Sequence, residues 1–350
     1  MTVNAEQSTV PPMATSALEQ TPACSSLHGR VSTGAHAEVE RDLGARAPAP
    51  AWWRDFMTLS KPGITTFCLI MTAGGAGAAW ALPGLRAETA SVMGVLWAML
   101  GTALSVAGAN AMNMWMEREG DRKMRRTRSR PLPAGRMKPA VAFAYGATLG
   151  LVSTALLYAQ VNAVTAGLSA FAFLSYVLVY TPMKRMSAAA LFVGAVPGAM
   201  PPLLGWTAVT GVLSAPGLAL FAILFVWQMP HFIAISIYRQ RDYDEAGILV
   251  LPSTRGMERA KTQALVWSIL LVASSLMLVV LGVAGTLYMA VALAVGGWFF
   301  VWSMRGYEPG AGNAWARSFF LASLVYLPVL TLALVLDMAL FGSLWFARVG

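Results

Sequence analysis

Nine long apolar stretches, separated by short polar links, occupy most of the chain after about residue 50. Each stretch is long enough for one bilayer-spanning helix, which needs about 20 predominantly apolar residues. The expected spans cover residues 62–82, 91–116, 139–159, 163–181, 188–210, 214–238, 263–283, 286–304 and 318–342. The pattern therefore predicts an all-α membrane protein that crosses the bilayer nine times.

Positive charge alternates from link to link. Beyond the first 50 residues, twenty Lys or Arg residues lie on one side of the predicted membrane. The other side has two, Arg86 and Arg348. Because links rich in Lys and Arg face the cytoplasm, we expect a cytoplasmic N-terminus and a C-terminus outside.

Composition agrees with this topology. Only 12% of the residues are charged, whereas soluble proteins carry about 25%. The net charge of +9 lies mainly in the short links, where membrane orientation explains it, so we expect no nucleic-acid partner. Cys24 and Cys68 are too few for a disulfide framework or a cysteine metal cluster.

Residues 1–50 are rich in Ala, Ser, Pro and Thr and contain no apolar run. We expect a disordered N-terminal tail there, followed by a membrane domain over residues 51–345. Glu6 and Glu19 precede the first arginine, Arg30, which disfavours a mitochondrial transit peptide. We therefore expect a bacterial inner (plasma) membrane protein, with the mitochondrial inner membrane as the alternative.

The end of the second stretch places Asn113, Glu117 and Asp121 four residues apart. Steps of four turn a helix by only about 40° each, so the three side chains share one face. Six Lys or Arg residues follow within residues 122–130. Oxygen ligands beside such a cluster fit a divalent metal that carries a phosphate or diphosphate. The alternative is a solvated loop whose acids offset its bases.

A second acidic segment, residues 238–252, follows the sixth stretch, and Asp242 is its best candidate ligand. Four crossings separate it from the first cluster, so both open on the same side. Two facing sets of carboxylates can hold Mg²⁺ ions with a diphosphate between them. Taken alone, however, the segment is also typical of an amphipathic surface helix.

Four basic residues near these clusters are candidates for contacts to diphosphate oxygens: Lys184, Arg185, Arg126 and Arg130. The segment Pro131-Leu-Pro133 would hold Arg130 rigidly. The alternative interpretation treats Lys184 and Arg185 as ordinary determinants of membrane orientation.

His231 and Gln228 lie inside the sixth stretch, next to Pro230. His231 precedes Tyr238 by seven residues, which places it roughly 10 Å inside the interface. Such a position beneath the acidic clusters favours a role in binding a second substrate. A hydrogen-bonded packing role is the alternative.

Six separated stretches resemble, in order, motifs of the UbiA superfamily of intramembrane prenyltransferases, and in detail its branch that farnesylates haem. They cover residues 58–63, 126–135, 180–185, 193–206, 227–232 and 242–247. Asn113-x₃-Glu117-x₃-Asp121 is similar to the first Asn/Asp-rich motif of the superfamily, with Glu117 where Asp is common. The second acidic segment lacks the regular Asp-x₃-Asp spacing of many relatives. The resemblance extends over about residues 52–340.

This resemblance implies a UbiA-type helical bundle that works within the lipid bilayer. The implied reaction transfers a farnesyl group from farnesyl diphosphate to a vinyl group of haem b, with hydration, giving haem O. Haem A synthase or oxidase assembly proteins would be partners. Another aromatic acceptor, such as 4-hydroxybenzoate, and a non-enzymatic membrane carrier are the alternatives. A carrier should have functional polar groups on both sides of the membrane, and here nearly all lie on one.

The resemblance also assigns roles to the candidate residues. It implies Mg²⁺ as cofactor, held by Asn113, Glu117, Asp121 and Asp242. Diphosphate would be bound by Arg126, Arg130, Lys184 and Arg185. The residues expected to act directly on the leaving group are Asp121, Lys184 and Arg126, and those expected to orient haem are His231 and Gln228.

Overall fold

The computed structural model describes residues 52–124 and 127–349, and side-chain burial is described as far as residue 341. This part of the chain is helical and contains no strand. Nine segments within it are long and apolar enough to cross a membrane, as the sequence predicts. The protein is therefore a multi-pass membrane protein. The predicted tail, residues 1–50, lies outside the described residues.

The helices alternate with short turns along the chain. They are α2 (Trp52–Ser60), α3 (Pro62–Trp80), α4 (Val92–Lys123), α5 (Pro139–Gln160), α6 (Ala163–Leu174), a π-helix (Ser175–Tyr180), α7 (Thr181–Met183), α8 (Ala190–Gly198), α9 (Met200–Thr210), α10 (Ala215–Tyr238), α11 (Gln240–Glu245), α12 (Leu251–Arg255), α13 (Met257–Val280), α14 (Thr286–Met304) and α15 (Asn313–Val349), with 3₁₀ turns at Pro83–Leu85 and Arg305–Tyr307.

Local sequence explains where several helices begin. Ser91 caps α4, because its side chain accepts a hydrogen bond from Gly94 N at 2.9 Å. Asn162 caps α6 in the same way. Such caps satisfy N–H groups that have no partner within the helix. Helix α4 continues past residue 116, the predicted end of its span, to Lys123.

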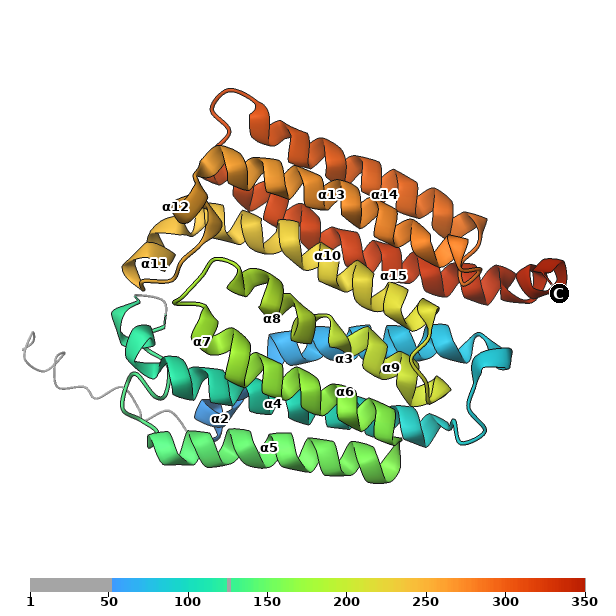
Figure 1. Cartoon of the computed structure of the whole chain (residues 1–350), viewed down its shortest axis with the longest axis horizontal. Helices are drawn as coiled ribbons and strands as arrows, with labels where there is room; N and C mark the ends of the chain where they lie inside the picture. The colour runs from blue at the N-terminus through green and yellow to red at the C-terminus, as the bar shows by residue number, and fades with distance from the viewer. Residues whose placement is uncertain (1–51, 125–126, 350) are drawn as a thin grey trace, which may run out of the picture. The chain divides into compact units, whose positions relative to one another are not determined.

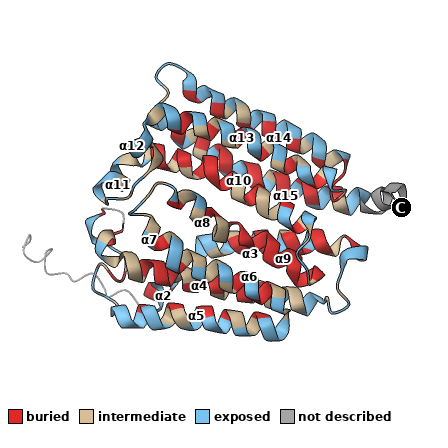
Figure 2. Ribbon diagram, in the orientation of Figure 1, coloured by how far each residue is buried: buried red, intermediate tan, exposed pale blue. Residues whose placement is uncertain are grey.

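The helices pack in groups that differ in burial. Helices α10, α13, α14 and α15 contact one another and lie together in Figure 1, whereas α3 packs on α9 and α4 packs on α5. All eleven residues of α9 are buried, and Figure 2 shows it as buried, with exposed residues on α5 and α14. The outer helices thus present apolar side chains to lipid, and α9 belongs to the interior.

Close approach of backbones holds α3 against α9. A methyl group added at Gly75 would collide with the backbone of Pro202, and one added at Gly205 would collide with the backbone of Thr72. Small residues allow this approach in membrane helices. The glycine run of the first span is therefore a packing surface at Gly75.

The links after the second, fourth and sixth spans meet at one end of the bundle, where α7, α11 and α12 lie (Figure 1). We call this the polar end. The even number of crossings between the two acidic segments predicts this meeting. The side of the membrane that it faces stays a prediction from the charge pattern.

Candidate active site

The acidic face of α4 opens into a cavity of about 240 Å³ at the polar end. Asn113, Glu117 and Asp121 all line it, so the four-residue spacing correctly predicts that they share a face. Because α4 continues to Lys123, a single rigid helix positions all three.

Two ion pairs join this face to basic residues from other segments. Lys184 Nζ lies 2.9 Å from Glu117 Oε1, and Arg130 Nη1 lies 2.7 Å from Asp121 Oδ2. Both cations line the cavity, and their contacts with a diphosphate stay a prediction. Burial opposes the charge on Lys184, but the neighbouring tyrosines and Glu117 outweigh it and raise its pKa.

The turn after α4 returns Arg130 to the cavity. Thr127 donates a hydrogen bond from Oγ1 to the carbonyl of Asp121 at 2.9 Å, and Arg130 N bonds to the carbonyl of Thr127. This turn brings Arg130 back to an acid nine positions earlier in the chain.

Asn113 supplies a test of whether a metal fits this site. Its side chain is 2% exposed, and its Nδ2 atom has no hydrogen-bond partner in the described structure. A buried amide without a partner is costly. Because the oxygen and nitrogen of an amide are assigned from their surroundings, the unpaired atom can equally be a metal-binding oxygen. One amide and two carboxylates form a donor set that fits Mg²⁺.

The cavity is also lined by polar residues that the sequence analysis did not select, among them Lys61, Tyr176 and Tyr180. The tyrosines lie on the π-helix Ser175–Tyr180, a rare element that frequently occurs at functional sites. Lys184 Nζ lies 4.5 Å from the centre of the Tyr180 ring. The π-helix thus directs both tyrosines, and Lys184 after it, toward the polar cavity.

Lys61 is held in an unusual backbone conformation. Its φ angle of 45° is in the left-handed region, which for a residue other than glycine costs about 1 kcal/mol or more. Burial lowers the pKa of Lys61 to about 8, and the neighbouring charges of Arg130 and Lys184 act in the same direction. In the sequence, Lys61 is a basic residue directly before Pro62; it counts toward the charge pattern that predicts topology and lies in the motif at residues 58–63.

Other predicted diphosphate ligands lie elsewhere. Arg126 is outside the described residues. Arg185 is exposed, does not line the cavity, and places its guanidinium against Gly120 of α4. The structure therefore brings Lys184, but not the next residue, into the site.

Asp242 also lies apart from the α4 acids. Its carboxylate pairs with Arg239 at 3.3 Å on the surface of α11, whereas Tyr243 and residues 248–251 line the cavity. Among the residues that the structure describes, no group of three or more His, Cys, Asp or Glu side chains is placed to hold a metal. A ligand role for Asp242 stays a prediction.

Gln228 and His231 lie in the interior of α10, 5% and 8% exposed. The amide of Gln228 donates to the carbonyls of Ala195 and Leu224, at 3.1 and 3.2 Å. The bond to Ala195 joins α10 to α8, close to the point where α8 ends and α9 begins. Nδ1 of His231 lies 2.7 Å from Oγ of Ser323 on α15. Neither residue lines the polar cavity.

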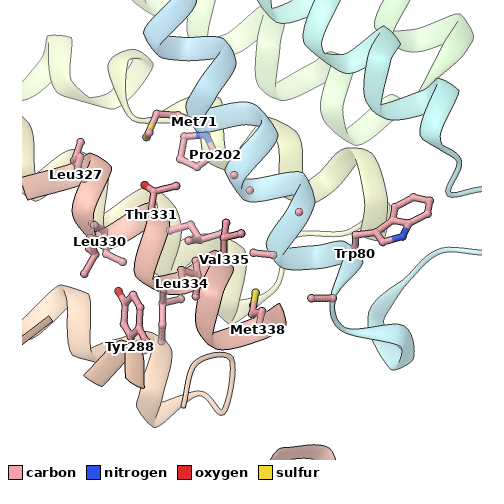
Figure 3. A pocket seen from close by; sticks show the side chains of 18 of the residues that line it. Met71, Trp80, Pro202, Tyr288, Leu327, Leu330, Thr331, Leu334, Val335 and Met338 are labelled. Carbon is pink, nitrogen blue, oxygen red and sulfur yellow. The ribbon is translucent and has the colours of Figure 1, made fainter. Parts of the chain in front are cut away.

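A second, apolar cavity of about 410 Å³ lies between α3, α10 and α15, toward the other end. Figure 3 shows Leu327, Thr331, Val335 and Met338 of α15 around it. Arg86 is its one charged lining residue within the described chain, and this guanidinium bonds to the carbonyl of Trp80. The lining of this cavity is almost entirely apolar, whereas charged side chains line the polar cavity.

Comparison with known proteins identifies a family for this chain. A family model described as the UbiA prenyltransferase family matches residues 66–324. A protoheme IX farnesyltransferase of Sorangium cellulosum is 51% identical over 239 residues, which is 68% of this chain and 85% of that protein. Another, of Anaeromyxobacter dehalogenans, is 46% identical over 83% of this chain and 96% of that protein.

Solved structures share the fold at low sequence identity. One, of digeranylgeranylglyceryl phosphate synthase in membranes, matches with a TM-score of 0.67 at 18% identity, covering 82% of this chain and 98% of that one. A UbiA homologue from Archaeoglobus fulgidus bound to DMAPP and Mg²⁺ matches with a TM-score of 0.58 at 15% identity, covering 80% and 99%.

Proposed function

This chain belongs to the UbiA prenyltransferase family, and we propose that it transfers a farnesyl group from farnesyl diphosphate to a vinyl group of haem b, with hydration. The names of its relatives support the two substrates. The observation that carries the proposal is the polar cavity, which joins one amide, two carboxylates and three cations. We place the protein in the inner (plasma) membrane of a bacterium, with the polar end toward the cytoplasm.

Charge balance supports a metal diphosphate as the ligand of this cavity. The charged lining residues within the described chain are Lys61, Arg130 and Lys184 against Glu117 and Asp121, which leaves an excess of one positive charge. Without ligand, each carboxylate is neutralised by a cation, so no buried carboxylate is left unpaired. A magnesium diphosphate is an anion, which this excess complements.

Binding would exchange partners within the two ion pairs. The carboxylates of Glu117 and Asp121 would turn to Mg²⁺, together with the amide oxygen of Asn113. Lys184 and Arg130 would then contact the diphosphate oxygens, with Lys61 as a third cation. Mg²⁺, when bound, would supply further positive charge to the departing diphosphate.

These cations would lower the barrier to the first step, in which the bond between farnesyl C1 and the diphosphate oxygen breaks. Negative charge grows on the leaving group there, and preorganised cations stabilise it. Apolar side chains of the cavity, such as Leu191 and Phe232, would exclude water from the allylic cation.

The terminal carbon of the haem vinyl group then bonds to farnesyl C1, and positive charge moves to the inner vinyl carbon. Water adds at that carbon and releases a proton, which leaves a hydroxyl group. His231 and Gln228 would orient the porphyrin. The chain needs no nucleophile of its own for these steps.

The direct test uses the purified full chain in detergent with haem b, farnesyl diphosphate and Mg²⁺, and detects haem O by its mass. We expect product from the wild type and almost none from Asp121→Ala. Glu119→Ala is the matched control, since Glu119 lies on the same helix but is exposed and pairs with Arg122. Absence of product from the wild type, or equal activity of the two variants, would refute the proposal.

A further inference from the structure

His231 lies in an aromatic layer between the two cavities. On α10, Leu224 lines the apolar cavity and Phe232 lines the polar one. The His231 ring stacks on Trp227 with centres 4.5 Å apart, and its centre lies 4.8 Å from that of Phe320 on α15. A porphyrin whose vinyl group must meet farnesyl diphosphate would have to come close to this layer.

Ser323 of α15 joins this layer through both its hydroxyl and its carbonyl. Trp227 donates from Nε1 to the Ser323 carbonyl at 2.8 Å. The hydroxyl lies 2.7 Å from Nδ1 of His231, and it donates to the carbonyl of Phe320 at 2.6 Å. Ser323 is completely buried, so water does not compete for these bonds.

The hydroxyl bonds determine which nitrogen of His231 carries the proton. A serine hydroxyl has one proton to donate, and here the Phe320 carbonyl receives it. The hydroxyl oxygen must therefore accept from His231, which requires a proton on Nδ1. In the neutral imidazole, Nε2 then carries the free lone pair.

Nothing in the described chain uses that lone pair. Within residues 52–124 and 127–349, no hydrogen bond engages Nε2 of His231. A histidine that serves only to pack usually has both nitrogens satisfied. A histidine that binds a metal instead donates through its other nitrogen to an oxygen, which fixes the tautomer and makes the binding nitrogen more basic.

We propose that Ser323 is a positioning residue that holds His231 as the Nδ1–H tautomer, so that Nε2 binds the iron of the haem acceptor. The inference rests on the proposed function, because haem is the substrate there. Iron ligation at this layer would hold the porphyrin beside the polar cavity. Ser323 itself touches no substrate.

The test measures binding of haem b and of iron-free protoporphyrin IX to the full chain in detergent, by absorbance and fluorescence. We expect Ser323→Ala to weaken haem binding about 10- to 100-fold, the usual effect of losing such a partner. The iron–histidine stretching frequency of the ferrous complex should fall, since Nε2 becomes less basic. Affinities for protoporphyrin IX and farnesyl diphosphate should not change.

Three further variants keep the test decisive. Ser323→Thr retains the hydroxyl and should restore haem affinity and the stretching frequency. Ser268→Ala removes another completely buried serine, whose hydroxyl bonds only the carbonyl of Ala264 on its own helix, and should leave both unchanged. If Ser323→Ala does not fold, Ser323→Cys, a weaker hydrogen-bonding group of similar size, should give an intermediate loss.

Equal loss of haem and protoporphyrin IX would show a structural role and overturn the inference, as would an unchanged iron–histidine signal in Ser323→Ala. Its failure can be told apart from failure of the proposed function. If the wild type makes haem O but iron ligation does not change in Ser323→Ala, only the inference is contradicted. If iron ligation depends on Ser323 but the wild type makes no haem O, only the proposed reaction is contradicted.

Discussion

Buried acids at the two ends of the bundle are neutralised by different kinds of partner. In the polar cavity, Glu117 and Asp121 pair with the side chains of Lys184 and Arg130. Toward the other end, Asp337 is 4% exposed and accepts backbone N–H groups of Gly285 and Tyr288 at the start of α14. Side-chain partners beside a cavity can move to a ligand, whereas backbone partners are fixed. Burial alone therefore does not identify a functional acid.

This contrast also explains the role of Asp337 in the fold. The first N–H groups of a helix have no partner within it, and in a membrane no water supplies one. Asp337 supplies it from α15, so it joins α14 to α15. Asp337 therefore has a structural role, because it caps a helix other than its own.

The largest expected effect is on activity and comes from the polar cavity. Asp121→Asn combined with Arg130→Gln removes both charges of one ion pair, so no buried charge is left unpaired. We expect haem O formation to fall about 1000-fold, or about 4 kcal/mol of transition-state stabilisation. The melting temperature in detergent should stay close to that of the wild type.

The matched control for that double variant is Glu119→Gln with Arg122→Gln, an exposed pair on the same helix. Its activity should stay within about twofold, because exposed pairs contribute little. A large drop in melting temperature for the Asp121 and Arg130 variant would mean that its ion pair serves the fold, as Asp337 does.

The reverse result is expected for Asp337→Ala. Two buried N–H groups lose their acceptor, which should lower the free energy of unfolding by about 3 kcal/mol. The rate of haem O formation per folded molecule should not change. Thermal unfolding in detergent and an assay at low temperature measure the two quantities. Loss of activity in protein that remains folded would place Asp337 in the site.

Gly75→Ala tests the packing that surrounds the apolar cavity. The added methyl group meets the backbone of Pro202, which cannot move without shifting α9, so we expect a loss of about 2 kcal/mol in unfolding free energy. Gly77→Ala, on the same helix, has nothing within 4 Å of the added group. It should be neutral or slightly stabilising, since alanine favours the helix. Equal melting temperatures for the two variants would contradict the close contact.

The smallest expected effect concerns Lys61. Its pKa of about 8 means that its charge is present below that pH and is lost above it. Its contribution to binding of farnesyl diphosphate should fade as the pH rises through 8, by at most about tenfold per pH unit. Lys61→Arg keeps its charge, so titration calorimetry at pH 7 and pH 9 should show a smaller change for this variant. Equal pH dependence in both proteins would remove Lys61 from the diphosphate site.

Prediction from sequence succeeded where a feature depends on neighbouring residues. The nine spans follow from runs of apolar residues, and the shared face of Asn113, Glu117 and Asp121 follows from helix geometry. Lys184 and Arg130 were found because they end or follow a span near that face. Lys61 was missed because its own left-handed backbone conformation, directly before Pro62, directs its side chain into the cavity. The tyrosines were missed because the π-helix that turns them inward has no clear sequence pattern.

Asp242 and Arg185 are predicted site residues that the structure places outside the polar cavity. Both have the residue type and the side of the membrane that the site requires, but α11 directs the Asp242 carboxylate toward Arg239, and Arg185 lies against Gly120. A shift of one or two residues along a helix changes the direction in which a side chain points, and a sequence motif does not specify that direction. The roles of Asp242 as a metal ligand and of Arg185 as a diphosphate ligand stay predictions.

The sequence by itself determined the nine-span helical fold, the end of the bundle that carries the charged chemistry, and the oxygen-bearing face of α4. These follow from burial of apolar residues in lipid and from the regular turn of a helix, which act over a few residues. The tertiary structure alone decided which cation meets which acid, that Asp337 is a cap, and that Ser323 faces His231 across 92 positions of the chain. Such pairings depend on how helices distant in sequence pack and rotate against one another, and no local pattern encodes that.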